Sequence, residues 1–147
     1  MYRMKILTPL LIFISLLTSC GEEKETIYLL FEANTEGTCH ISAYRDGREK
    51  KEVQFTYQKN EKSNNDIRFN ICYQTFEYQA QKQTSTKLTT KPNKIVNIDY
   101  LLNKWEEQPT TFDRSTAFEN IYIVESNADG TYTQYQVNWI EVTENKY

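Results

Sequence analysis

NIYIVESNADGTYTQYQVNWIEV, residues 120–142, is the stretch that indicates most clearly how this chain folds. Two runs rich in β-branched and aromatic residues, 120–125 and 132–142, flank a polar loop that closes on Asp129-Gly130. Asp-Gly is typical of the turn of a β-hairpin. Because side chains alternate along a strand, one face of the second run carries three large residues: Tyr135, Val137 and Trp139. The stretch therefore predicts a C-terminal antiparallel hairpin.

The β pattern continues towards the N-terminus. Runs of apolar and aromatic residues predict further strands over residues 26–31, 38–44, 51–57 and 67–78. Asp46-Gly47, within residues 45–48, marks a turn between the second and third of these runs. The apolar phase of the longest run changes near Thr75-Phe76, which suggests a bulge or bend there. Residues 59–66 are expected to form a polar loop, and residues 79–90 fit either an edge strand or an exposed loop.

One helix is predicted near residues 98–107. Asn97 has the character of a helix cap and Pro109 of a stop signal. Between them, apolar residues recur with helical spacing: Ile98, Leu101, Leu102 and Trp105. The sum is a single mainly-β domain over residues 26–147, an antiparallel β-sandwich or small barrel with one short helix. The alternative is an α+β fold, a single sheet with the helix packed across it.

The N-terminus has the three zones of a secretory signal peptide. Arg3 and Lys5 supply a positive start, and residues 6–17 (ILTPLLIFISLL) are almost wholly apolar. Two small residues, Thr18-Ser19, then precede a cysteine. The apolar run is too short for a transmembrane helix, which needs about 20 residues.

Residues 17–20 (LTSC) resemble the lipobox of bacterial lipoproteins. The resemblance implies that the thiol of Cys20 is joined to a diacylglyceryl group and that residues 1–19 are then removed. Several acyl chains on Cys20 would hold the protein on a membrane. Residues 20–25 form the lipidated cysteine and a charged tether. By analogy with Gram-negative bacteria, Gly21 in place of an aspartate disfavours retention in the inner membrane, and the acidic Glu22-Glu23 resemble the surface-export signals of some Bacteroidota lipoproteins. This favours the outer membrane and leaves open the periplasmic and the surface-exposed face.

The charge balance excludes some partners. Removing Arg3 and Lys5 with the signal peptide leaves 15 basic residues against 20 acidic ones, a net side-chain charge of about −5. Nucleic acid selects a basic surface, so it is not an expected partner. Attachment to the membrane is expected through the lipid on Cys20 and not through charge.

Two cysteines remain, Cys39 and Cys72, and an even pair in an oxidising compartment suggests a disulfide. Strand parity complicates this pairing. Cys39 shares a face with Ile41, whereas Cys72 alternates with Ile71, so strict alternation in both strands can turn the two thiols to different sides. A bulge or a strand buried on both faces would allow the bond.

The sequence does not predict catalysis. His40 follows Cys39 in a strand, where neighbours point to opposite faces, so a rim histidine is favoured over a Cys-His nucleophile pair. No His or Cys cluster has zinc spacing, and neither a metal nor a cofactor is expected. Asp113, Glu119 and Glu125 are candidates for a glycosidase-type carboxylate pair. With 20 acids in the chain, such pairs arise readily by chance.

Binding is the favoured function. Aromatic residues that suit interfaces and sugar sites gather near the helix and the C-terminal hairpin: Trp105, Tyr122, Tyr132, Tyr135 and Trp139. Several of them are also expected in the core. The sequence thus predicts a non-catalytic, lipid-anchored envelope domain that binds a protein, peptide or glycan. One alternative is an inhibitor or immunity lipoprotein that blocks a hydrolase or toxin, and a less favoured one is a small hydrolase.

Overall fold

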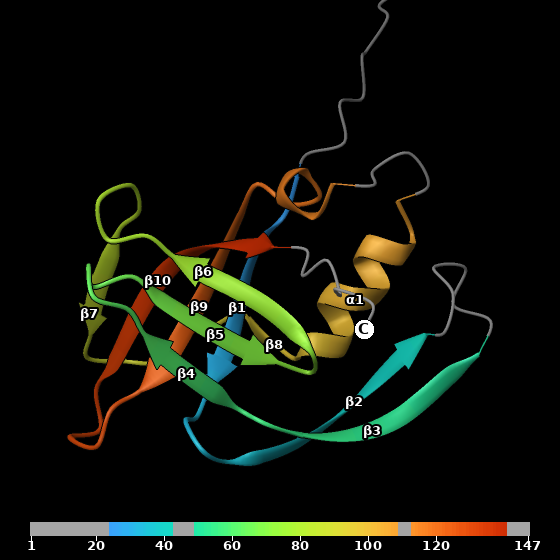
Figure 1. Cartoon of the computed structure of the whole chain (residues 1–147), viewed down its shortest axis with the longest axis horizontal. Coiled ribbons are helices and arrows are strands. Elements are labelled where there is room, and N and C mark those ends of the chain that lie inside the picture. Colours follow the sequence, from blue (N-terminus) through green and yellow to red (C-terminus); the bar gives the residue numbers. More distant parts are fainter. Residues whose placement is uncertain (1–23, 43–48, 109–112, 141–147) are drawn as a thin grey trace, which may run out of the picture.

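The computed structural model describes residues 24–42, 49–108 and 113–140 (Figure 1). These residues form ten strands, one α-helix and one 3₁₀-helix: β1 (Thr26–Phe31), β2 (Glu36–Ser42), β3 (Lys50–Thr56), β4 (Gln58–Glu61), β5 (Ile67–Ile71), β6 (Gln74–Tyr78), β7 (Ser85–Leu88), β8 (Ile95–Val96), α1 (Ile98–Glu106), η1 (Arg114–Thr116), β9 (Asn120–Ser126) and β10 (Tyr132–Ile140). The signal peptide, Cys20, the turn 45–48 and Pro109 lie outside the described residues.

The protein is mainly β with one α-helix in the described ranges, and its mostly antiparallel strands form two sheets, compatible with the predicted sandwich. The larger sheet has eight strands in the order β4-β5-β6-β10-β9-β1-β8, with β7 also paired to β10. The smaller sheet is the β2–β3 hairpin. Figure 1 shows β4, β5 and β6 as a layer in front of β10, β9 and β1. The sheet folds over on itself at β10: residues 132–137 of this strand pair with β9, and its last three residues pair with β6.

Aromatic side chains fill the space between the two layers. Phe31 of β1 and Phe69 of β5 meet edge to face with ring centroids 5.0 Å apart, and Phe76 of β6 stacks on Trp139 of β10 at 5.9 Å. All four rings are at most 2% exposed. Each such pair contributes about 0.5–1.5 kcal/mol beyond the burial of its apolar area. The core therefore ties the front layer to the back layer.

The C-terminal hairpin predicted from residues 120–142 is present as β9 and β10, which pair in antiparallel register from Tyr132–Ser126 to Val137–Ile121. Strand β1 also occupies its predicted residues. Its partners differ from the antiparallel expectation, because β1 runs parallel to both β9 and β8. About ninety residues separate β1 from β9, so the intervening chain is long enough to return β9 in the same direction as β1.

Residues 67–78 form a hairpin and not the single long strand that the sequence predicted. Ile71 pairs with Gln74, and the two residues between them, Cys72 and Tyr73, have φ angles of 51° and 57°. Positive φ at both central residues defines a type I′ turn, which normally takes Asn-Gly or Gly-Gly. Cys-Tyr carries no such signal, so the sequence does not predict this turn. The predicted change of phase near Thr75-Phe76 marks the start of the returning strand β6.

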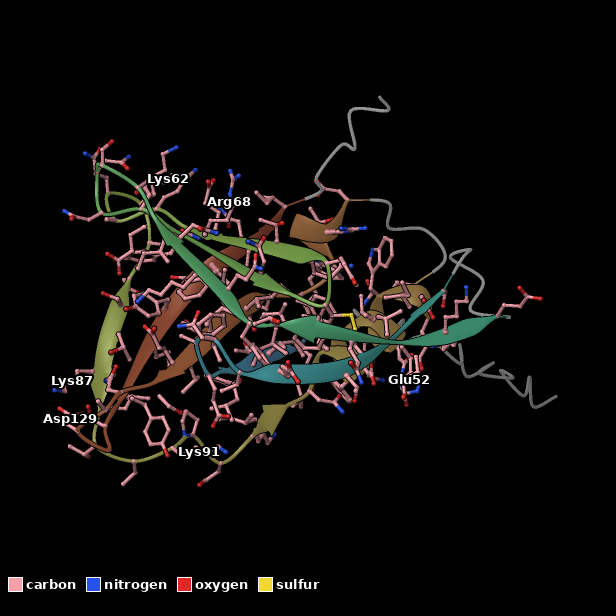
Figure 2. The ribbon with its side chains drawn as sticks, turned by 60° about the horizontal axis from the view of Figure 1, so that its bottom comes forward. Glu52, Lys62, Arg68, Lys87, Lys91 and Asp129 are labelled. Carbon is pink, nitrogen blue, oxygen red and sulfur yellow. A yellow bond between two sulfur atoms is a disulfide. The ribbon has the colours of Figure 1, made fainter. Side chains whose placement is uncertain are left out.

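This turn also places the cysteines. Cys39 in β2 and Cys72 in the turn are joined by a disulfide with Cα atoms 6.1 Å apart. Strand parity does not apply to Cys72, because it lies between two strands and not within one. Figure 2 shows the yellow sulfur–sulfur bond between the β2–β3 ribbon and the β5–β6 turn. The disulfide therefore fastens the small sheet to the end of the front layer.

Two polar stretches, residues 59–66 and 79–90, contain strands. Residues 59–66 were expected as a loop, but β4 takes the first part of them and pairs with β5. Strand β4 continues β3 almost directly, so one bent run of chain pairs with β2 in its first half and with β5 in its second. Residues 79–90 contain β7, an edge strand that pairs with β10.

Helix α1 begins at its predicted cap. The side-chain oxygen of Asn97 accepts a hydrogen bond from the backbone N–H of Tyr100 at 2.9 Å, and the inward face carries Ile98, Leu101 and Leu102. Asp99 accepts hydrogen bonds from the backbone N–H of His40 in β2 at 2.7 Å, so the helix and the small sheet are joined. In the described part of the chain, no helix is long and apolar enough to cross a membrane.

Candidate functional site

A surface groove of about 560 Å³ lies where the small sheet meets the front layer. We call it the amide groove; it is lined by Gln54, Phe55, Thr56, Gln58, Asn70, Cys72, Tyr73 and Thr75. Gln58, Asn70 and Thr75 lie side by side on β4, β5 and β6. The core residues Phe69 and Phe76 point to the other side of these strands, so the groove is on the outer face of the front layer.

Tyr73 projects at one side of the amide groove. Its side chain is 69% exposed, whereas every other large apolar residue within the described ranges is at least partly covered. Its hydroxyl donates a hydrogen bond of 3.4 Å to the backbone carbonyl of Gln54 in β3. The type I′ turn and the adjacent disulfide at Cys72 fix the backbone that carries the ring. The ring is therefore both exposed and held in place.

Amides and hydroxyls supply the polar part of the lining. The side-chain oxygen of Asn70 accepts a hydrogen bond of 3.0 Å from the hydroxyl of Thr75, which is 5% exposed. This bond leaves the amide nitrogen of Asn70 for other partners. Within the described residues, the side-chain amides of Gln54 and Gln58 form no hydrogen bond. The lining thus offers several unused donors and acceptors.

Among the described residues, the lining contains no Asp, Glu, Lys, Arg or His, although a quarter of the chain is charged. Charged groups lie beyond its ends. Figure 2 shows Lys62 and Arg68 close together at one end of the front layer, and Glu52 far from them on the small sheet. Glu77 accepts hydrogen bonds from Lys62 at 2.5 Å and from Arg68 at 3.3 Å, and the bond from Lys62 lowers the pKa of Glu77. Glu77 thus bridges the two basic side chains at this end of the front layer.

The His40 side chain is a rim group, as the sequence suggested. Its Nδ1 lies 2.9 Å from Asp99 and its Nε2 lies 3.7 Å from Glu52. The neighbouring Cys39 is fully buried and bonded to Cys72, so it has no free thiol to act as a nucleophile. His40 therefore contributes to the contact between the small sheet and α1.

Two of the three candidate carboxylates, Glu119 and Glu125, lie at opposite ends of β9. Glu125 is held at one end of β9 by the ammonium of Lys59 at 2.8 Å and by the hydroxyl of Tyr135 at 3.2 Å. Glu119 precedes the other end of β9, roughly 20 Å away along a strand that rises about 3.3 Å per residue. Asp113 is exposed in front of η1. Glu119 and Glu125 are therefore too far apart for a glycosidase-type pair.

Burial lowers the pKa of the Lys59 amine, but the hydrogen bond and the charge of Glu125, with smaller contributions from Tyr135 and Glu61, together outweigh burial and raise this pKa. Burial likewise raises the pKa of Tyr135, whose ring lies 5.7 Å from the amine. The Lys59–Glu125 pair joins β4 in the front layer to β9 in the back layer. Its role in the structure is to connect the two layers.

The aromatic residues singled out from the sequence form no single exposed patch. Trp139 is buried, and Trp105 meets it edge to face at 5.7 Å. The guanidinium of Arg114 covers both rings, 4.9 and 5.1 Å from their centroids. Tyr122 stacks on Tyr28 of β1 at 5.2 Å on the outer face of the back layer. Two further members, Tyr132 and Tyr135, are half-buried. The exposed ring belongs instead to Tyr73, which sequence reasoning did not single out.

A second hollow of about 550 Å³ lies between the start of β1 and α1, and it is lined by Glu25, Thr26, Tyr28, Lys94, Val96 and Tyr100. The hydroxyl of Tyr100 donates a hydrogen bond of 2.9 Å to Glu25, which raises the pKa of Tyr100. This bond joins two of the lining side chains to each other. The amide groove has the larger set of uncommitted polar groups and the more exposed ring.

No cluster of three or more metal-ligating side chains occurs among the described residues. Comparison with known proteins finds no matching family model, no similar curated protein and no similar solved structure.

Proposed function

We propose that this protein is a lipid-anchored binding or accessory domain of the cell envelope, non-catalytic, with the amide groove as its ligand site. The observation that carries the proposal is Tyr73, a 69% exposed ring fixed beside an uncharged, concave surface. Concave surfaces that combine aromatic groups with a few placed polar groups are the usual binding sites of proteins.

The backbone at Tyr73 supports this assignment. Both turn residues hold positive φ angles, which are uncommon for residues other than glycine and asparagine. Such conformations concentrate at ligand sites, where the surrounding structure keeps them in place. A side chain fixed before binding also loses less conformational entropy when a ligand arrives. The turn and its disulfide therefore prepare Tyr73 for binding.

The proposed anchor is the lipid on Cys20, on the outer membrane. The tether precedes β1, a strand of the back layer (Figure 1). The amide groove lies on the outer face of the front layer. A protein held by this tether can present the groove away from its point of attachment. Cys20→Ala is expected to release the protein from the membrane fraction, and membrane retention of that variant would contradict the anchor.

The ligand site is tested by retaining envelope components on the immobilised protein. Tyr73→Ala is compared with Tyr132→Ala, a half-buried tyrosine of β10 that does not line the groove. We expect components that bind the native protein and Tyr132→Ala but not Tyr73→Ala. Equal retention by all three proteins, or no retention by any, would contradict the proposal.

One feature favours a second candidate, an inhibitor or immunity lipoprotein. Tyr73 stands on a turn braced by the Cys39–Cys72 disulfide, and a rigid projecting turn suits insertion into the cleft of a hydrolase or toxin. Protection of cells from such an enzyme, lost in Tyr73→Ala and in Cys20→Ala, would support this candidate. Protection that persists in both variants would oppose it.

A further inference from the structure

We propose that the amide groove binds a neutral carbohydrate chain, with one sugar ring lying on the ring of Tyr73. This inference rests on the proposed function and names the chemical class of its ligand. Four properties of the groove lead to it. They are the polar side chains of the lining, the exposed ring of Tyr73, the absence of charge among the described lining residues, and the hydrogen bond from Tyr73 to the free edge of β3.

The lining chemistry matches a polyhydroxylated ligand. Each sugar hydroxyl can donate one hydrogen bond and accept two, and each primary amide offers two donors and two acceptor sites. Gln54, Gln58 and Asn70 place three amides around one hollow, with the hydroxyl of Thr56 among them. The volume of about 560 Å³ is within the usual range of about 300–1,000 Å³ for small-ligand sites.

Tyr73 supplies the apolar part of a sugar site. The C–H groups on one side of a sugar ring form an apolar face that packs on an aromatic ring, while the hydroxyls around the edge remain free for hydrogen bonds. Tyrosine combines such a ring with a polar tip. The hydroxyl of Tyr73 donates a long hydrogen bond of 3.4 Å to the Gln54 carbonyl, which favours one orientation of the ring while the residue stays 69% exposed.

The absence of charge in the lining disfavours ionic ligands. An anionic polysaccharide needs Lys or Arg in its site, and the nearby Lys62 and Arg68 are engaged by Glu77. A cationic ligand needs carboxylates, and no described residue of the lining carries one. A neutral carbohydrate chain needs no charged partner in its site.

An extended peptide fits less well. Strand β3 pairs with β2 along one edge, and its other edge has no strand partner among the described residues. A peptide would add to that edge through backbone hydrogen bonds. The hydroxyl of Tyr73 hydrogen-bonds the Gln54 carbonyl on that side at 3.4 Å, so an added strand would compete with Tyr73 for this group. Phe55 offers no pocket for a peptide side chain, because its ring packs on Gly37 and on Tyr57 at 4.9 Å.

The test titrates the protein, purified in mild detergent, with neutral glucans and mannans of several linkages. A uronic acid polymer and uncharged peptides serve as alternative ligands. Tyr73→Ala is expected to weaken glycan binding at least about tenfold, the scale of an aromatic anchor. Tyr73→Phe keeps the ring and should retain binding within about threefold, since only the hydroxyl is lost. Thermal unfolding of each variant establishes that it folds.

A matched pair of charge variants tests the neutral lining. Gln58→Glu introduces a carboxylate into the groove and is expected to weaken binding about tenfold, the effect of losing one well-placed hydrogen-bonding group. Gln134→Glu makes the same change on β10, outside the groove, and should leave binding unchanged. Equal effects of the two substitutions would contradict the assignment of the groove.

The outcomes separate this inference from the proposed function. Binding of a neutral glycan that depends on Tyr73 and tolerates Tyr73→Phe supports the inference. Binding of the uronic acid polymer alone, of peptides alone, or of no neutral glycan overturns it. If envelope components are still retained in a Tyr73-dependent way, the proposed function stands with another ligand. If that retention is absent too, both fail.

Discussion

The Cys39–Cys72 disulfide is expected to contribute about 4 kcal/mol to the free energy of unfolding. The bond closes a loop with a sequence separation of 33 residues, and its two cysteines are 0% and 1% exposed. In the chain-entropy model, a cross-link of this length removes about 12.5 cal/mol/K from the unfolded state, or about 3.7 kcal/mol at 25 °C. Replacing both cysteines by alanine removes the cross-link and keeps both positions apolar.

Urea denaturation followed by tryptophan fluorescence measures the effect, because Trp139 is buried in the core. With a denaturant slope of about 2 kcal/mol/M, the midpoint should fall by about 2 M in the Cys39→Ala/Cys72→Ala variant. The native protein unfolded in the presence of dithiothreitol is the matched control, since it lacks the bond but keeps both sulfur atoms.

The same variant tests the link between the disulfide and the ligand site. Cys72 and Tyr73 are the two central residues of one turn, so loss of the bond should also weaken Tyr73-dependent binding. A stability loss below about 1 kcal/mol, with ligand binding unchanged, would refute the view that the bond organises this end of the molecule.

Two smaller perturbations test the helix and the charges beside the groove. Asn97→Ala removes the acceptor for the Tyr100 N–H and should lower the free energy of unfolding by about 1 kcal/mol, which lowers the midpoint of thermal unfolding by a few degrees. Asn97→Asp retains an acceptor, so equal losses of stability in both variants would contradict the capping role. The pKa of Glu77 is lowered in the folded protein, first by its bond from Lys62, so its stabilisation is complete above the pKa of an unfolded glutamate and declines as pH falls through the folded value. Glu77→Gln should therefore be less stable near pH 7 and should approach the native protein at low pH in pH-dependent urea titrations; parallel curves would contradict this.

The parts of the fold that local sequence patterns specify were predictable. Thr26–Phe31 is a strand because a short apolar run of β-forming residues has few other stable forms. Asn97 begins the helix because its side chain bonds a backbone N–H that the first turn leaves unpaired. These signals lie within a few residues of the structure that they determine.

The parts that depend on distant contacts were not predictable. Nothing near Cys72-Tyr73 indicates a type I′ turn, because the conformation is held by contacts elsewhere, including the bond to Cys39. The parallel pairing of β1 with β9 likewise depends on the path of the intervening chain. Both features determine which side chains reach the surface.

The candidate site was not predictable from the sequence, because it depends on the turn at Cys72-Tyr73. With residues 67–78 taken as one strand, Tyr73 is one alternating residue among many, and nothing distinguishes it from the tyrosines of the C-terminal hairpin. The hairpin places it at a projecting tip beside Asn70 and Gln54. Aromatic composition predicted a binding protein, but only the turn shows which aromatic residue is exposed.

The most direct test of the proposed binding site is deuterium exchange of the protein with and without envelope extract. The proposal predicts that slowed exchange is concentrated in residues 54–58 and 70–75, the segments that line the amide groove. It also predicts that Tyr73→Ala abolishes this protection. Protection confined to the Tyr28–Tyr122 face, or no protection anywhere, would contradict the assignment of the amide groove as the ligand site.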